Sequence, residues 1–173
     1  ALPLLKRGVP VSITHLENTS YADTWKDVEV LLMTYSNMKP LDPKAHQDLA
    51  DWVKKGGIIV YCGRDNDPYQ QVLEWWNQNG NTYTAPSQHL FGLMQLPDMA
   101  EEGIYHYGKG KVYVVRQDPK EFVMQERGDQ SLLSVIEKAY GKLEYKNHFY
   151  LERGPYTLAA VVDEDAVSSE PLQ

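Results

Sequence analysis

The single cysteine of the chain, Cys62, stands where a catalytic nucleophile would stand. It follows an apolar run at 58–61 (IIVY) and precedes Gly63 and a polar loop. Several hydrolases present a nucleophile at the sharp turn between a buried strand and a helix. A free thiol has a pKa of about 8.5, so a neighbouring histidine would have to activate it. The alternative interpretation is that Cys62 is a small buried residue at the end of a strand.

The histidines are the candidate bases for this thiol, and the chain has five: His15, His46, His89, His106 and His148. His15 would end the first predicted strand and face the same crevice as Cys62. His89 lies in a loop or helix whose position the sequence does not fix. His46 is predicted to point away from the carboxyl end of the strand that holds Cys62. None has a spacing to Cys62 that demands contact, so we expect no catalytic site and keep His15 and His89 as weak candidates.

Two aspartates in the following loop offer oxygens that a hard cation would bind. Asp65 and Asp67 are separated by one residue, but such cations need several oxygen ligands. Asp67 also precedes Pro68, so it is predicted to cap the next helix, and Asp65 to shape the turn. We therefore keep both as weak ligand-binding candidates and expect no metal and no cofactor.

Trp75 and Trp76, together with Tyr69, offer flat aromatic faces on which a sugar ring would stack. Adjacent residues on a helix point about 100° apart, so at most one of the two rings faces the core. The spacing of Val72, Leu73 and Trp76 predicts that these three form the inward stripe of a helix. Trp75 is then expected to be exposed in the isolated chain, where a partner would cover it or a sugar would bind it.

Strands and helices alternate in the first half of the chain. The predicted strands cover 9–16, 28–34 and 58–62, and the predicted helices cover 42–55 and 68–78. Nearly continuous apolar runs are typical of strands buried on both faces of a parallel sheet. Asp42 is predicted to cap the first of these helices and Gly56 to end it.

The second half of the chain reads as hairpins around one further amphipathic helix. The predicted elements are one or two helical turns at 87–95, a hairpin at 103–117, a helix at 130–144 and a hairpin with strands at 146–152 and 156–162. This order predicts an α/β three-layer sandwich, with a mostly parallel sheet and antiparallel hairpins added at its edge. Ligand sites in such sheets lie at the carboxyl ends of the strands, which here are 14–18, 34–38 and 62–67.

The segment 28–63 resembles the class I glutamine amidotransferase-like superfamily, because it repeats the family's order of strand, loop, helix and strand. Its helix carries the residues that match this pattern: Asp42, Leu49, Trp52, Val53, Gly56 and Gly57. The strand at 105–115 and the strand pair at 149–164 are similar to later parts of the same group. The resemblance implies a flavodoxin-like sheet. It is strongest to the non-catalytic accessory domains of multidomain glycoside hydrolases, such as the trimerisation domain of one β-galactosidase family.

The sequence departs from the catalytic members of that family in two places. Those members carry Gly-x-Cys-x-Gly around the nucleophile, whereas positions 60–64 here read VYCGR. They carry a later His-x-Glu, whereas positions 116–119 here read RQDP. The family's first strand is also missing ahead of the opening helix at 1–7, so we expect an excised piece or a lost strand.

Length and charge limit the classes of function that remain. The 173 residues suit one α/β domain at 1–163, followed by a tail or linker at 164–173. The net charge is −7, of which the last eleven residues carry −4. No cluster of Lys and Arg marks a nucleic-acid surface, and no apolar stretch is long enough to span a membrane. One cysteine leaves the compartment open, with a secreted or periplasmic precursor as one expectation.

Three hypotheses about function follow. The first is a non-catalytic accessory domain of a larger carbohydrate-active enzyme, which packs against sibling domains or subunits. The second is a cysteine-dependent amidotransferase-like hydrolase that uses Cys62 with His15 or His89. The third is a carbohydrate-binding module that uses Trp75 or Trp76. The absent late His-x-Glu and the acidic tail favour the first.

Overall fold

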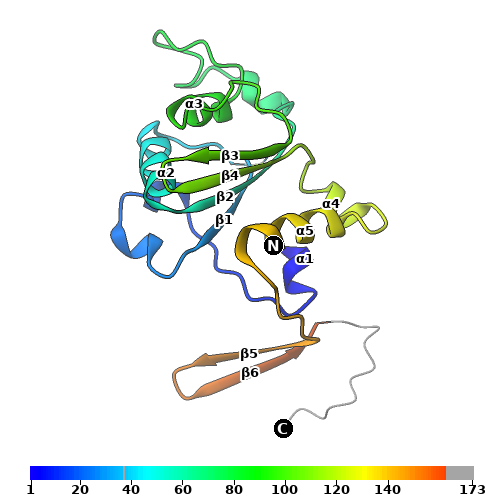
Figure 1. The fold of residues 1–173 in the computed structure, drawn as a ribbon. Helices are drawn as coiled ribbons and strands as arrows, with labels where there is room; N and C mark the ends of the chain where they lie inside the picture. Colours follow the sequence, from blue (N-terminus) through cyan, green and yellow to red (C-terminus); the bar gives the residue numbers. More distant parts are fainter. Residues whose placement is uncertain (37, 163–173) are drawn as a thin grey trace.

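A computed structural model describes residues 1–36 and 38–162 of the chain (Figure 1). The α-helices are α1 (Leu2–Leu5), α2 (Lys44–Lys55), α3 (Pro86–Leu93), α4 (Glu121–Met124) and α5 (Asp129–Tyr140). Three 3-10 helices are η1 (Leu16–Asn18), η2 (Ala22–Trp25) and η3 (Pro68–Gln71). The strands are β1 (Val30–Met33), β2 (Ile58–Cys62), β3 (Gly103–Tyr107), β4 (Gly110–Val115), β5 (His148–Arg153) and β6 (Tyr156–Val161).

The main sheet has the strand order β1-β2-β4-β3. Strands β1, β2 and β4 are parallel, and β3 joins β4 as an antiparallel edge strand. Leu31 lies opposite Ile59, and Ile59 opposite Val112. The predicted neighbours 28–34 and 58–62 are therefore paired in one mostly parallel sheet. The α/β class is confirmed.

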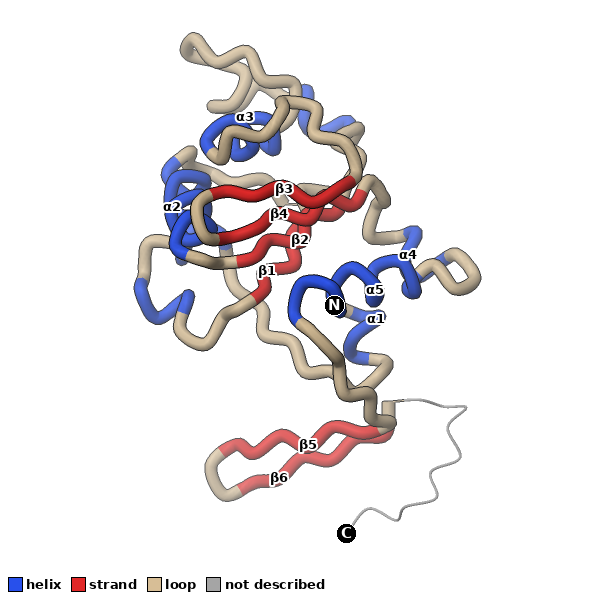
Figure 2. Tube along the Cα trace, viewed as in Figure 1, coloured by secondary structure: helices blue, strands red, loops and turns tan. Residues whose placement is uncertain are grey.

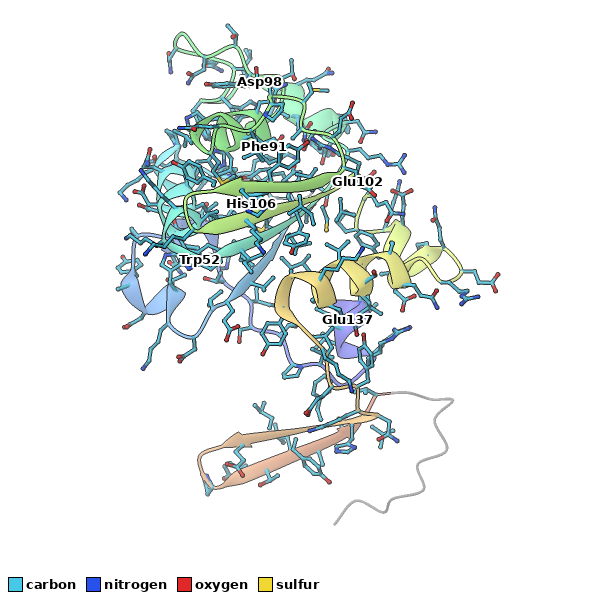
Figure 3. The ribbon with its side chains drawn as sticks, viewed as in Figure 1. Trp52, Phe91, Asp98, Glu102, His106 and Glu137 are labelled. Atoms are coloured by element: carbon cyan, nitrogen blue, oxygen red, sulfur yellow. The ribbon has the colours of Figure 1, made fainter. Side chains whose placement is uncertain are left out.

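Helices cover both faces of this sheet (Figure 2). Because side chains alternate along a strand, Ile59 and Tyr61 point to the face that α2 and α3 cover, while Val60 and Cys62 point to the face covered by α1, α4 and α5. The ring of Phe91 from α3, which is labelled in Figure 3, packs edge-on against Tyr61, and the two ring centroids are 5.1 Å apart. Two separate apolar clusters thus sandwich the sheet.

Helix α2 follows the sequence prediction closely. Pro43 occupies the N-cap position in place of the predicted Asp42, and the Asp42 carboxylate, one residue earlier, accepts a hydrogen bond from the Lys44 N–H at 2.7 Å. Gly56, with a φ of 131°, ends the helix in a conformation that favours glycine. Leu49 and Val53 are fully buried on the face that meets the sheet. This helix is held by both its cap and its apolar stripe.

The predicted strand at 9–16 is wrong. Residues 9–15 pair with no strand of the described chain and lead into η1. Val9 and Val11 pack against the cluster on the α5 side, but Ile13 is 89% exposed. Three alternating apolar residues are too few to distinguish a strand from an extended crossing segment, which shares the same backbone region.

The predicted helix at 68–78 is also wrong beyond its first turn, because only η3 forms. The Asn77 side chain binds backbone groups that a helix would have used. It donates to Val72 O and accepts from the Glu74 N–H. Such local hydrogen bonds compete with helix formation. Trp76 still points inward, but Val72 and Leu73 are exposed, so the predicted inward stripe does not exist.

Of the two predicted hairpins, only the first belongs to the main sheet. The predicted hairpin at 103–117 forms β3 and β4, and the turns predicted at 87–95 form α3. The predicted helix at 130–144 forms α5. The second hairpin, β5 and β6, is a separate two-stranded sheet and not an addition to the edge of the main sheet. The tail at 164–173 lies outside the described residues.

Candidate functional site

The carboxyl ends of β1, β2 and β4 meet at one edge of the sheet, where parallel α/β proteins bind ligands. A small hollow there is lined mainly by polar residues, among them Thr34, Ser36, Asp65, Asn66, Asp67 and Asp118. It encloses about 20 Å³, roughly the space of one water molecule. Of the three segments predicted at this edge, those after β1 and β2 line the hollow, and 14–18 does not. This hollow is the candidate site.

Asp65 is the centre of a hydrogen-bonded network at the hollow. Its carboxylate lies 2.5 Å from Nη1 of Arg116 and also accepts a short hydrogen bond from the Tyr61 hydroxyl. Arg116 donates further to the carbonyl oxygens of Gly63 at 3.0 Å and Ala100 at 2.8 Å. Asp65 itself has a φ of 57°, which aspartate tolerates in tight turns. The network ties the loop after β2 to the end of β4.

Asp67 caps η3, as predicted, and forms an ion pair with Lys39. Its carboxylate accepts hydrogen bonds at 2.8 Å from the Tyr69 N–H and from Lys39 Nζ. Desolvation by itself would raise the pKa of Asp67, but the hydrogen bonds from Lys39 and Tyr69 outweigh it and lower that pKa. Asp65 and Asp67 therefore each face a different cation. Among the described residues, no group of three or more metal-ligating side chains gathers.

The remaining charged side chains at the hollow are also paired or hydrogen-bonded with one another. Arg64 Nη2 lies 2.7 Å from Oε1 of Glu121, and the Arg64 N–H donates to the Asp118 carboxylate at 3.3 Å. The Asp118 N–H in turn donates to the other Glu121 oxygen at 2.7 Å. The carboxylates here thus serve as acceptors for the backbone and for guanidinium groups.

Cys62 is enclosed in the apolar cluster on the α5 side and is 3% exposed. Burial raises the pKa of its thiol to about 12, and the nearby amino terminus opposes this rise only in part. His89 belongs to α3, on the opposite face of the sheet. The structure therefore does not bring Cys62 and His89 together. It supplies the thiol with an apolar environment that disfavours the thiolate.

The structure instead joins His46 and His89 in a chain of hydrogen bonds that begins at Tyr35. The Tyr35 hydroxyl lies 2.5 Å from His46 Nε2, and His46 Nδ1 lies 2.9 Å from His89 Nδ1. The expectation that His46 points away from the carboxyl edge is wrong, because α2 starts just after β1 and its first turn faces Tyr35. Burial, and then the neighbouring His89, lowers the pKa of His46 to about 3. Burial also lowers the pKa of His89.

Trp75 and Trp76 pack beside these histidines. The Trp75 ring meets the rings of His46 and His89 edge-on, with centroids 5.4 and 5.1 Å away, and its Nε1 donates to Pro40 O at 2.8 Å. Trp75 is half-buried, so the prediction that it is exposed is wrong. Trp76 is 2% exposed, as predicted. The Trp76 indole is therefore not accessible to a sugar, and the Trp75 indole is only partly so.

His15 extends into solvent, with 68% of its side chain exposed and Nδ1 4.0 Å from the Glu17 carboxylate. His15, Leu16 and Glu17 do form a His-x-Glu tripeptide, a match that the sequence reasoning missed. This tripeptide precedes Cys62 in the chain, whereas the amidotransferase-like order places it after the nucleophile. Its exposure gives it no role beside a buried thiol.

Sequence reasoning also missed a group of exposed apolar side chains next to the hollow. We call it the carboxyl-edge patch; its members are Met38, Leu41, Tyr69, Val72 and Leu73. The two loops that carry it are held together by the Lys39–Asp67 ion pair and by the Trp75–Pro40 hydrogen bond. Leu41 is 81% exposed and Leu73 76%. Where exposed apolar side chains form one continuous surface, that surface commonly serves as an interaction site.

Comparisons with protein-family models, with curated proteins and with solved structures gave no match to this chain. None of the helices in residues 1–36 and 38–162 has the length and apolar character needed to cross a membrane.

Proposed function

We propose that the chain is a non-catalytic accessory domain of a larger carbohydrate-active enzyme, with a flavodoxin-like, amidotransferase-like fold. Its role is to pack against sibling domains or subunits. The observation that carries this proposal is the carboxyl-edge patch. The edge of the sheet where related folds hold a catalytic site here carries exposed apolar side chains on two clamped loops.

Three features of the edge support a packing role over catalysis. Cys62 is buried on the face opposite His89. Asp65 and Asp67 are each paired with a cation. The hollow has room for about one water molecule and not for a substrate. A hydrolase needs a nucleophile, a base and a space for the reacting atoms in contact with one another.

The carbohydrate context rests on the resemblance of segment 28–63 to accessory domains of glycoside hydrolases. The fold is compatible with that resemblance, because its parallel strands, its capped helix α2 and its glycine pair at 56–57 occupy the expected order. A carbohydrate-binding module based on Trp75 or Trp76 has less support, since both indole N–H groups are engaged by backbone carbonyls.

The test uses the whole translated polypeptide that contains these residues. We expect it to hydrolyse glycosidic bonds through residues outside 1–162. The double variant Leu41→Glu, Leu73→Glu should weaken assembly, seen as faster limited proteolysis between domains or as loss of subunits in light scattering. The expected weakening is at least tenfold in association, because interface anchors commonly contribute about 1.4 kcal/mol or more.

The control is Ile13→Glu, which adds a charge at another highly exposed apolar residue that is not a member of the patch. It should leave assembly within a factor of two. A polypeptide without a carbohydrate-active domain would overturn the carbohydrate part of the proposal. Unchanged assembly in the double variant would overturn the packing role of the patch.

A further inference from the structure

Two histidines from neighbouring helices meet beside Trp75, which links the two loops of the carboxyl-edge patch. Helices α2 and α3 lie side by side on one face of the main sheet (Figure 1). His46, from α2, is fully buried, and His89, from α3, is half-buried. The packing role proposed above makes no use of this histidine pair.

The two imidazoles are joined end to end by one hydrogen bond. Their Nδ1 atoms are 2.9 Å apart and their ring centroids are 5.2 Å apart. The centroid distance nearly equals the Nδ1–Nδ1 distance plus the two short distances from each nitrogen to its own ring centre, so both nitrogens lie close to the line between the rings. Each Nδ1 therefore points at the other, as in an N–H···N hydrogen bond, whereas two nitrogens that share a metal ion both point at the ion.

This geometry fixes the number of protons in the histidine pair. One proton must lie between the two Nδ1 atoms, because two N–H groups or two lone pairs that face each other repel. The Tyr35 hydroxyl lies 2.5 Å from His46 Nε2 and has no other hydrogen-bond partner among the described residues. A buried hydroxyl without an acceptor is costly. Tyr35 therefore donates to His46, and His46 donates to His89.

A further proton has no favourable place in this chain of hydrogen bonds. Both nitrogens of His46 and Nδ1 of His89 are already engaged. If His89 becomes an imidazolium, its Nδ1 must donate to His46, and His46 must donate to Tyr35. The Tyr35 hydroxyl then loses its acceptor inside the protein. Uptake of a proton thus leaves a buried polar group unpaired.

The surroundings of the histidine pair also disfavour a positive charge. In the part of the chain that the structure describes, neither imidazole lies within ion-pair distance of a carboxylate. The titratable side chains that face the pair or its direct contacts are three tyrosines and two existing ion pairs: Tyr35, Tyr61, Tyr83, Asp65–Arg116 and Lys39–Asp67. Burial accordingly lowers the pKa of both imidazoles.

The loop at 75–83 packs on the histidine pair. The Trp75 ring is nearly perpendicular to both imidazoles, and the Tyr83 ring lies 5.5 Å from that of His89. The Tyr83 N–H donates to Trp76 O at 3.0 Å, and the Asn81 side chain donates to Trp75 O at 2.7 Å. These bonds close the loop on itself, so it meets the pair as one unit.

From this geometry we propose that the His46–His89 pair is a pH-sensitive switch. When the pair takes up a proton, the hydrogen bonds from Tyr35 to His89 break and the loop at 75–83 separates from α2 and α3. Trp75 then leaves Pro40 O, and the two loops of the carboxyl-edge patch lose one of the two links described above. The effect on assembly rests on the proposed packing role, whereas the release of Trp75 does not.

The test measures hydrogen exchange of the Trp75 indole N–H in the full chain, because this group is protected while it binds Pro40 O. Between pH 7.5 and 5.0 its protection, corrected for the intrinsic exchange rate, should fall about thirtyfold, since one imidazole with a pKa of about 6.5 in the open state takes up a proton that the closed state does not. Dilute urea should change this protection little, because a local opening exposes little surface.

The double variant His46→Gln, His89→Gln removes both titrating groups and should keep the protection within about threefold over the same pH range. The matched control His15→Gln changes an exposed histidine and should keep the thirtyfold fall. Constant protection in the wild type would overturn the inference, and so would the same fall in the double variant. Protection that decreases with urea as steeply as global stability would also overturn it, because Trp75 would then be released only by unfolding.

Assembly of the whole polypeptide provides the second measurement. It should be weaker at pH 5.0 than at pH 7.5 in the wild type, and should not change in the double histidine variant. Acid-sensitive exchange without weaker assembly would overturn the link between the switch and the patch. If exchange is constant while Leu41→Glu, Leu73→Glu still weakens assembly, the switch fails and the proposed function stands, so the two proposals fail separately.

Discussion

Cys62 lies on one face of the main sheet, and the hydrogen-bonded histidines His46 and His89 lie on the other. Because of this separation, neither imidazole activates the thiol. Cys62 alternates with Tyr61 along β2, so the residue next to it faces the histidine side while the thiol faces α5. A shift of the β2 register by one residue would place Cys62 on the histidine side of the sheet and Tyr61 on the α5 side. The buried thiol is protonated, and the buried His46 is neutral at ordinary pH.

The thiol of Cys62 should react slowly in the native chain. Burial raises its pKa to about 12, so alkylation by iodoacetamide between pH 7 and 10 should follow transient unfolding and not a local thiolate. The same chain in urea should titrate with a pKa of about 8.5, which is the control. An apparent native pKa at or below about 7.5, the range of activated thiols, would contradict the structure.

His46 should make the chain less stable in acid. Its pKa falls from about 6.5 when unfolded to about 3 when folded, so between these values the unfolded chain binds the proton and the folded chain does not. Its contribution to stability is complete above about pH 6.5 and is lost as the pH falls toward 3. Between pH 7 and 4.5 the loss is roughly 2–3 kcal/mol.

Urea unfolding of the wild type and of His46→Leu at these two pH values measures that contribution as the difference between their pH dependences. His15→Gln is the control, because it removes an exposed histidine and should keep the wild-type difference. A His46→Leu variant with the same loss of stability in acid as the wild type would show that other groups govern it.

At the scale of elements, the helices and strands with strong local sequence signals were predicted correctly. Continuous apolar runs predicted β1 and β2, and the apolar stripe that ends at Gly56 predicted α2. The strand at 9–16 was predicted from too few alternating residues. The helix at 68–78 fails because the Asn77 side chain binds the backbone at Val72 and Glu74. The His46–His89 contact joins residues that are 43 positions apart, so no local pattern in the sequence predicts it.

The two tryptophans should differ in their contribution to stability. Trp76 is 2% exposed, so Trp76→Ala should cost about 3–5 kcal/mol, as for large buried aromatics. Trp75→Ala should cost roughly 1–3 kcal/mol, because it removes packing on His46 and His89 and the hydrogen bond to Pro40. Leu73→Ala, at an exposed position, should change stability by less than about 0.5 kcal/mol. Urea melts rank the three; a Trp75→Ala loss as small as that of Leu73→Ala would contradict the observed packing.

The whole molecule consists of a two-cluster body and an outlying hairpin that contributes to neither cluster. The buried residues of α5, Leu132, Leu133 and Ile136, belong to the cluster that also contains Cys62, and Leu143 closes that cluster. None of the apolar residues that the structure describes in 147–162 belongs to, or packs against, either cluster. The hairpin is therefore expected to contribute little to the stability of the body.

A chain that ends after residue 146 should consequently keep the stability of the body. The loss in the free energy of unfolding should be less than about 1 kcal/mol, because local units with few buried apolar contacts contribute little to global stability. A chain that ends after residue 128 lacks α5 and should fail to fold cooperatively, since it opens the cluster around Cys62. Urea melts followed by tryptophan fluorescence compare the two with the full chain, as the indoles at 25, 52, 75 and 76 remain in both. A loss above about 2 kcal/mol in the first truncation would mean that the hairpin supports the body.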